Sequence, residues 1–213
     1  MFSTVNYCMN GNFSDNNTKM TSPSPFTLQR LLKQAKSAGC EYAVIETSSH
    51  SIFYNRNYGI DYDVVVLTNI SQDHLDLHKT MDHYVATKAK LFQNLMLYKR
   101  KGDVKKVSVV NMDSAHVTPF LEATADQMYT YGLSPSAQIR ATNIEDNETG
   151  MRFDVKIPSN TLSIETRLKG EFNVYNLLAA IAVLMSQKVP FDKISKTIQG
   201  TTGIPGRLEE VSN

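Results

Sequence analysis

Two carboxylates and two imidazoles lie close together in the stretch Asp73-His-Leu-Asp-Leu-His78, which follows the apolar run Val64–Leu67. Carboxylate oxygens and imidazole nitrogens suit Mg2+ or Mn2+ where phosphate is also present, whereas a closed zinc site would use more His or Cys ligands. Because ligands gather at the carboxyl ends of strands in open parallel sheets, this stretch predicts a metal or phosphate site. The structural alternative is a capped loop in which Asp73 or Asp76 bonds backbone amides at a helix start.

A second polar cluster, Glu46-Thr-Ser-Ser-His50, follows another apolar run. Glu46 could reach the same ion, or it could be an ordinary capping or solvated group. Ser48 and Ser49 lie beside His50, but the sequence has neither a Gly-x-Ser-x-Gly elbow nor an identifiable orienting acid, which argues against covalent serine chemistry.

Lys88 lies on a predicted helix, on a face shared with Tyr84 and Leu91. A lysine turned inward on such a face has a more nucleophilic amine, which can react with carbon dioxide to form a carbamate. The alternative is a surface lysine. The usual phosphate-binding loop, Gly-x-x-x-x-Gly-Lys-Ser/Thr, does not occur in the sequence, since none of its 10 glycines is followed by lysine.

These polar clusters require a framework of strands and helices. Compact apolar runs predict buried parallel strands, and apolar residues at helical spacing predict helices. The predicted strands are Phe2–Tyr7, Tyr42–Glu46, Asp63–Thr68, Lys106–Asn111 and Gln127–Tyr131, and the predicted helices are Phe26–Ser37, His83–Leu97, Asn173–Gln187 and Phe191–Gln199, with a loop over Asn10–Ser24. Three β-prone stretches within Gln138–Arg167, separated by turn signals, predict a small antiparallel appendage. The fold class is therefore α/β, with a mostly parallel, mixed sheet flanked by helices.

Composition narrows the possible partners. The 213 residues, 41% of them hydrophobic, can bury one substantial core, and 22 Lys+Arg against 21 Asp+Glu leave no electrostatic footprint of a nucleic-acid binder. No apolar run of about 20 residues, such as a membrane span needs, and no leader pattern at the start are present, so we predict a cytoplasmic protein without membrane or nucleic-acid partners. Cys8 and Cys40 form no CxxC pair and read as ordinary thiols.

Several blocks, taken in order, resemble the central domain of the Mur ligase family, and among its branches the MurE type. The blocks are Glu46–His50, Arg56, Thr68–His78, Tyr84–Phe92, Asn111-Met-Asp113, Gly170-Glu-Phe-Asn-Val-Tyr-Asn176 and Gly206-Arg-Leu-Glu209. Their order and spacing cover nearly the whole chain.

The resemblance implies an ATP-dependent acid–amino-acid ligase of peptidoglycan precursor synthesis. In such enzymes a carboxylate of UDP-N-acetylmuramoyl-L-alanyl-D-glutamate takes the γ-phosphoryl group of ATP, and the amine of diaminopimelate or lysine then displaces phosphate. By position, the resemblance implies that Mg2+ is bound by Glu46, His74 and carbamylated Lys88, and that His74 and Lys88 are catalytic. It also implies substrate contacts by Thr21, Ser22, Ser48 and Arg56. Nucleotide contacts are implied for Asn173, Asn176 and Arg207.

The resemblance also implies parts that this sequence lacks, because the family's phosphate-binding loop precedes the strand matched by Phe2–Tyr7. We expect residues 1–207 to form an incomplete central ATPase domain, truncated at its N-terminal P-loop portion, and residues 208–213 to begin the linker to an absent C-terminal domain. The chain alone should then be inactive. Alternatives are a binding module or split subunit that needs a P-loop-bearing partner chain, a cyanophycin-synthetase-like ligase, and a metal-dependent hydrolase built on His74, Asp76 and His78.

Overall fold

The computed structural model describes residues 1–18, 20–71, 75–158 and 160–203, which divide between two compact units. The first unit contains Met1–Asp63 and Gln72–Asp103, and the second contains Val64–Ser71 and Val104–Asn213. Within the described residues, no helix is long and apolar enough to cross a membrane.

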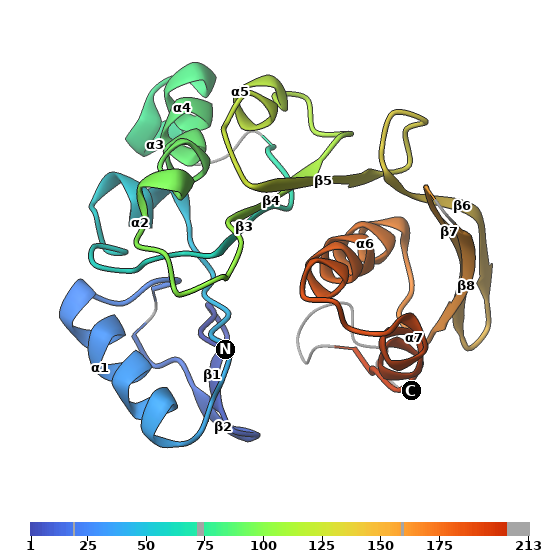
Figure 1. The fold of residues 1–213 in the computed structure, drawn as a ribbon, viewed down its shortest axis with the longest axis horizontal. Helices are drawn as coiled ribbons and strands as arrows, with labels where there is room; N and C mark the ends of the chain where they lie inside the picture. The colour runs from blue at the N-terminus through green and yellow to red at the C-terminus, as the bar shows by residue number, and fades with distance from the viewer. Residues whose placement is uncertain (19, 72–74, 159, 204–213) are drawn as a thin grey trace. The chain divides into compact units, whose positions relative to one another are not determined.

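A six-stranded mixed sheet organises the second unit (Figure 1). Its strands, adjacent in chain order, are β3 (Val64–Leu67), β4 (Val107–Asn111), β5 (Gln127–Gly132), β6 (Ile139–Asn147), β7 (Gly150–Ile157) and β8 (Asn160–Thr166). Strands β3 to β6 are parallel, and β7 and β8 continue the sheet antiparallel. The predicted α/β class and the antiparallel appendage are therefore confirmed, with the appendage joined to the main sheet through β5 and β6.

Residue types explain these strands. In β4 every residue is buried, including the polar Ser108 and Asn111, as expected for a strand covered on both faces. The turn between β6 and β7 requires Gly150, because a Cβ there would lie 1.9 Å from the main-chain oxygen of Thr166. Helix α6 (Glu171–Ser186) packs on β4, β5 and β6, α7 (Phe191–Gln199) packs on β8, and α5 (Thr118–Leu121) is a short turn after β4. The core between sheet and α6 includes Phe153, Ile164, Leu178 and Ile181, all at 0% exposure.

The first unit has little regular sheet. It contains the hairpin β1 (Asn6–Met9) and β2 (Asn12–Asp15), helices α1 (Pro25–Ser37), α2 (Ser49–Phe53), α3 (Leu75–His78) and α4 (Met81–Gln93), and the 3-10 turn η1 (Leu95–Leu97). Ser24 caps α1 and Thr80 caps α4, each accepting a main-chain N–H three residues later. A small core of Phe2, Leu28, Ala35 and Ile60 lies beneath these elements.

Three local predictions in the first unit are wrong. The strand predicted at Phe2–Tyr7 lies instead at Asn6–Met9, and Phe2 forms only isolated bridges. The run Tyr42–Glu46 forms only an isolated parallel bridge between Ile45 and Phe2, and Tyr42 and Val44 are 69% and 65% exposed, since no strand among the described residues covers them. The predicted loop Asn10–Ser24 contains β2, which pairs with β1 through a turn at Asn10 and Gly11.

Candidate functional site

Glu46 is held by a residue near the start of the chain. The main-chain N–H of Thr4 donates to Glu46 Oε2 at 2.6 Å, and the Thr4 hydroxyl donates to the same oxygen at 2.9 Å. The main chains are also joined here, since Glu46 N–H donates to the carbonyl of Phe2 at 2.9 Å. An exposed carboxylate is thereby fixed in place by two hydrogen bonds.

Two of the predicted substrate residues join the same cluster. Thr21 Oγ1 lies 3.0 Å from Thr4 Oγ1, and the Ser22 hydroxyl donates to the main-chain carbonyl of Glu46 at 3.0 Å. Ser22 is 1% exposed, whereas Thr21 is half-buried. The structure therefore brings together Thr21, Ser22 and Glu46, and adds Thr4 to them.

Ser48 and Arg56 lie at opposite ends of the next helical segment. Ser48 is the N-cap of α2 and accepts from the Ser51 main-chain N–H at 3.2 Å. The Arg56 guanidinium lies 5.5 Å from the centre of the Tyr54 ring, within cation–π range, and its main-chain N–H donates to the carbonyl of Ser51. An arginine stacked in this way keeps its planar donors for a phosphate or carboxylate.

Lys88 lies on α4 as predicted and is half-buried. Its ammonium lies 5.1 Å from the centre of the ring of Tyr84, which is 4% exposed and stands one helical turn earlier. The aromatic face therefore supports the side chain in a partly desolvated position.

Three histidines, from helices α2, α3 and α4, lie close together. His78 and His83 face each other with their Nδ1 atoms 3.3 Å apart, and the rings of His50 and Phe53 lie about 6 Å from that of His78, at 6.0 and 5.9 Å. His78 is 2% exposed. This histidine cluster connects α2 with α3 and α4.

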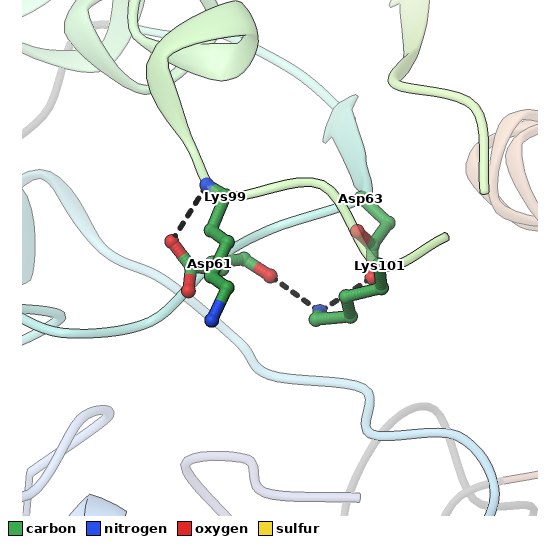
Figure 2. Close-up of polar contacts among 4 residues, drawn as sticks. All are labelled: Asp61, Asp63, Lys99 and Lys101. Atoms are coloured by element: carbon green, nitrogen blue, oxygen red, sulfur yellow. Dashed lines mark hydrogen bonds and ion pairs between the residues drawn. The ribbon is translucent and has the colours of Figure 1, made fainter. Parts of the chain in front are cut away.

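A lysine–aspartate clamp, formed by Asp61, Asp63, Lys99 and Lys101, joins two other segments of the first unit (Figure 2). The Lys99 main-chain N–H donates to Asp61 Oδ1 at 2.9 Å, and the Lys101 ammonium donates to the Asp61 carbonyl and to Asp63 Oδ2, both at 2.6 Å.

Tyr62, between these aspartates, extends the contact toward the candidate site. Its ring lies 5.5 Å from that of Tyr98, and its hydroxyl is 3.3 Å from Thr47 Oγ1, beside Glu46. Burial raises the pKa of Tyr62, and burial together with the nearby Tyr62 and Asp61 raises the pKa of Tyr98 to about 12.

In the second unit, polar groups at the carboxyl ends of β3, β4 and β5 are hydrogen-bonded to one another. The carbonyl of Thr68, just after β3, accepts from Asn111 Nδ2 at 2.7 Å and from the Tyr131 hydroxyl at 3.2 Å. Asn111 Oδ1 in turn accepts from the Asp113 main-chain N–H at 3.0 Å. Burial raises the pKa of Tyr131 above its ordinary value.

Asp113 joins the β5 turn to α6. Its carboxylate accepts from the main-chain N–H groups of Leu133 at 2.5 Å and Ser134 at 3.2 Å, and from the Tyr175 hydroxyl at 3.0 Å. A Cβ at Gly132 would lie 2.6 Å from Asp113 Oδ2, so only glycine leaves room for this carboxylate. Burial, followed by the hydrogen bond to Asp113 and its charge, raises the pKa of Tyr175 to about 12.

The predicted nucleotide residues Asn173 and Asn176 flank Tyr175 in the first turns of α6. Asn176 Nδ2 donates to Asn173 Oδ1 at 3.2 Å, and Asn173 Nδ2 donates to the Lys169 carbonyl at 2.9 Å. The two amides thus form a connected pair beside the Asp113–Tyr175 contact.

A family comparison now decides the class of protein. Residues 1–184 match the model of the Mur ligase middle domain. The chain belongs to the Mur ligase family.

Individual Mur ligases agree with this assignment. The UDP-N-acetylmuramoyl-L-alanyl-D-glutamate–2,6-diaminopimelate ligase of Lactiplantibacillus plantarum is 40% identical over 194 residues, which are 91% of this chain and 39% of that protein. UDP-N-acetylmuramyl-tripeptide synthetase 2 of Oceanobacillus iheyensis is 37% identical over 94% of this chain and 40% of its own length. A solved diaminopimelate ligase structure matches with a TM-score of 0.82 at 25% identity, over 99% of this chain and 43% of that chain. The chain thus spans about two fifths of the length of these relatives.

Of the metal ligands predicted for this Mur ligase chain, Glu46 and Lys88 lie within the described residues. His74, like Arg207, lies outside the described residues, and among the described residues no group of three His, Cys, Asp or Glu side chains could hold a metal ion. Glu46 fits a hard cation, because it is exposed and, among the described residues, no hydrogen bond ends on its second oxygen, Oε1. The ligand set of Glu46, His74 and carbamylated Lys88 stays a prediction.

Sequence reasoning missed Thr4, Asp113 and Tyr175 as members of these clusters. Thr4 lies in a short β-prone run, where nothing marks a side chain that reaches Glu46 across 42 positions of sequence. Asp113 and Tyr175 stand inside blocks that carried the resemblance, so those blocks were the available signal.

Proposed function

We propose that this Mur ligase chain is the substrate-side and metal-side portion of a MurE-type ligase that adds diaminopimelate or lysine to UDP-N-acetylmuramoyl-L-alanyl-D-glutamate. The observation that carries the proposal is the joining of Thr21, Ser22 and Glu46, predicted from separate segments, into one hydrogen-bonded cluster. The identity of 40% to a diaminopimelate ligase over 91% of the chain supports the same conclusion.

In the proposed reaction a substrate carboxylate takes the γ-phosphoryl group of ATP, and the incoming amine then displaces phosphate. Mg2+, when bound, would supply positive charge against the transferring phosphoryl group. Glu46, His74 and carbamylated Lys88 would hold the ion. Arg56, stacked on Tyr54, would bind an anionic group of the substrate, while Thr21, Ser22 and Ser48 would fix its position.

The nucleotide contacts would come from the second unit, through Asn173, Asn176 and Arg207. Because the sequence contains no Gly-Lys-Ser/Thr step, we propose that residues beyond these 213, in the same polypeptide or in a P-loop-bearing partner chain, cradle the phosphates. The chain by itself should then show no ATP-dependent ligation, which phosphate release in the presence of all substrates would measure.

Calorimetric titration of the chain with UDP-N-acetylmuramoyl-L-alanyl-D-glutamate tests the substrate side. Arg56→Met should weaken binding by about tenfold or more, since a charge-assisted contact contributes roughly 1.5–3 kcal/mol. Arg30→Met is the matched control, because Arg30 is an exposed arginine on α1 that has no part in the proposed site, and it should leave the affinity unchanged. Equal affinities of the unaltered and Arg56→Met chains, or no binding by either, would contradict the assignment of Arg56.

A further inference from the structure

The hydroxyl of Thr4 has more neighbours than it has protons. Thr4 Oγ1 lies 2.9 Å from Glu46 Oε2 and 3.0 Å from Thr21 Oγ1, yet a threonine hydroxyl carries a single hydrogen. An ionised carboxylate only accepts hydrogen bonds. The Thr4 hydroxyl is the donor in both contacts, and because the charged carboxylate is the stronger acceptor, its proton is directed mainly to Glu46.

The hydrogen bonds of this cluster show which protons are already in use. The Thr4 hydroxyl donates to Glu46 Oε2 at 2.9 Å and to Thr21 Oγ1 at 3.0 Å, and the Thr4 main-chain N–H is the second donor to Oε2 at 2.6 Å. The Ser22 hydroxyl proton is used as well, since it donates to the Glu46 carbonyl at 3.0 Å. The hydroxyl protons of Thr4 and Ser22 thus both point into the cluster.

Glu46 is left asymmetric by these contacts. Two donors from Thr4 occupy Oε2, while among the described residues none occupies Oε1. A carboxylate held by one oxygen presents the other in a fixed direction, which lowers the cost of ordering it around an ion.

We propose that Thr4 is a positioning residue that holds Glu46 so that Oε1 receives a divalent cation. This inference rests on the proposed function and extends it to a residue that has no role there. It predicts that the cation affinity depends on the hydroxyl oxygen of the side chain at position 4 and not on the size of that side chain.

The test uses Mn2+ as the probe, with binding to the full 213-residue chain followed by electron paramagnetic resonance. Loss of an outer partner of a metal ligand typically costs about 10- to 100-fold in metal affinity, so the near-isosteric Thr4→Val should weaken Mn2+ binding by about tenfold or more. Thr4→Ser keeps the hydroxyl and should restore the affinity to within about twofold, which distinguishes a hydrogen-bonding role from packing. Thr161→Val, an exposed threonine on β8, is the control and should have no effect.

Glu46→Gln distinguishes the metal role of Glu46 from the positioning role of Thr4. If Glu46→Gln weakens Mn2+ binding and Thr4→Val does not, the role of Thr4 is wrong while the proposed function stands. If the unaltered chain does not bind Mn2+, or binds it no better than Glu46→Gln, the metal role of Glu46 in the proposed function is wrong. The inferred role of Thr4 in cation binding is then wrong as well. A Thr4 amide that exchanges with solvent as fast in the unaltered chain as in Glu46→Ala would overturn the geometry of the Thr4 contact without any metal.

Discussion

The two units hold their candidate functional residues by different means. In the second unit, Asn111 and Tyr131 lie at the carboxyl ends of β4 and β5, and Asp113 lies just after β4. Their side chains bond mainly to main-chain groups at the strand ends. In the first unit, Thr4, Thr21 and Glu46 lie on irregular segments and bond to one another through side chains. The second unit thus positions these residues through its core, whereas the first relies on polar links. Substitutions should therefore cost stability in the second unit and ligand binding in the first.

The largest expected effect is in the core of the second unit. Phe153→Ala removes a side chain at 0% exposure and should lower the free energy of unfolding by about 3–5 kcal/mol. Phe26→Ala, at a position 88% exposed on α1, should change it by less than about 0.5 kcal/mol. Urea denaturation measures both, and similar midpoints for the two variants would break the comparison.

Asp113 should rank next. Asp113→Asn removes a charged acceptor shared by Leu133, Ser134 and Tyr175, and hydrogen bonds to charged groups contribute about 1.5–3 kcal/mol. We expect a destabilisation of that size in the same denaturation experiment. Asp146→Asn, an exposed carboxylate at the end of β6, is the control and should leave the midpoint in place.

The raised pKa of Tyr175 predicts a pH dependence at alkaline pH. Its neutral form is favoured in the folded state, with a pKa of about 12 against 10.0 unfolded, so its contribution to stability is complete below pH 10 and is lost as the pH rises through 12. Tyr175→Phe should therefore lose stability less steeply between pH 10 and 12 than the unaltered chain. Thermal melts across this range measure the difference, and parallel curves would show that Tyr175 does not titrate as the geometry requires.

The smallest effect is expected for the lysine–aspartate clamp of the first unit. The Lys101 and Asp63 side chains are 54% and 23% exposed, so solvent weakens their ion pair despite the 2.6 Å separation. Lys101→Met should cost about 0.2–1 kcal/mol, with the cost shrinking at high salt. A loss above about 2 kcal/mol would show that the clamp carries more of the first unit's stability than a surface ion pair can.

Sequence predicted the second unit better than the first, for physical reasons. Strand β3 and helix α6 could be predicted from the sequence because a continuous apolar run and a long apolar helix leave few alternatives. Tyr42–Glu46 carries the same β-type composition but is largely exposed, so composition alone overestimated its strand. The grouping of Thr21, Ser22 and Glu46 could be predicted only from the family resemblance. The part played by Thr4 could not be predicted, because a hydrogen bond across 42 positions leaves no local sequence pattern.

The central claim, that this chain supplies the substrate and metal side of a MurE-type ligase, is tested most directly by a chimera. The 194 residues of this chain that match the Lactiplantibacillus plantarum ligase replace the corresponding segment of that ligase. Phosphate release is then followed with ATP, UDP-N-acetylmuramoyl-L-alanyl-D-glutamate and diaminopimelate or lysine. We predict release that requires all three substrates and falls by at least about tenfold in the same chimera carrying Glu46→Gln. A folded chimera that binds ATP and the UDP substrate yet releases no phosphate, or one unaffected by Glu46→Gln, would contradict the claim.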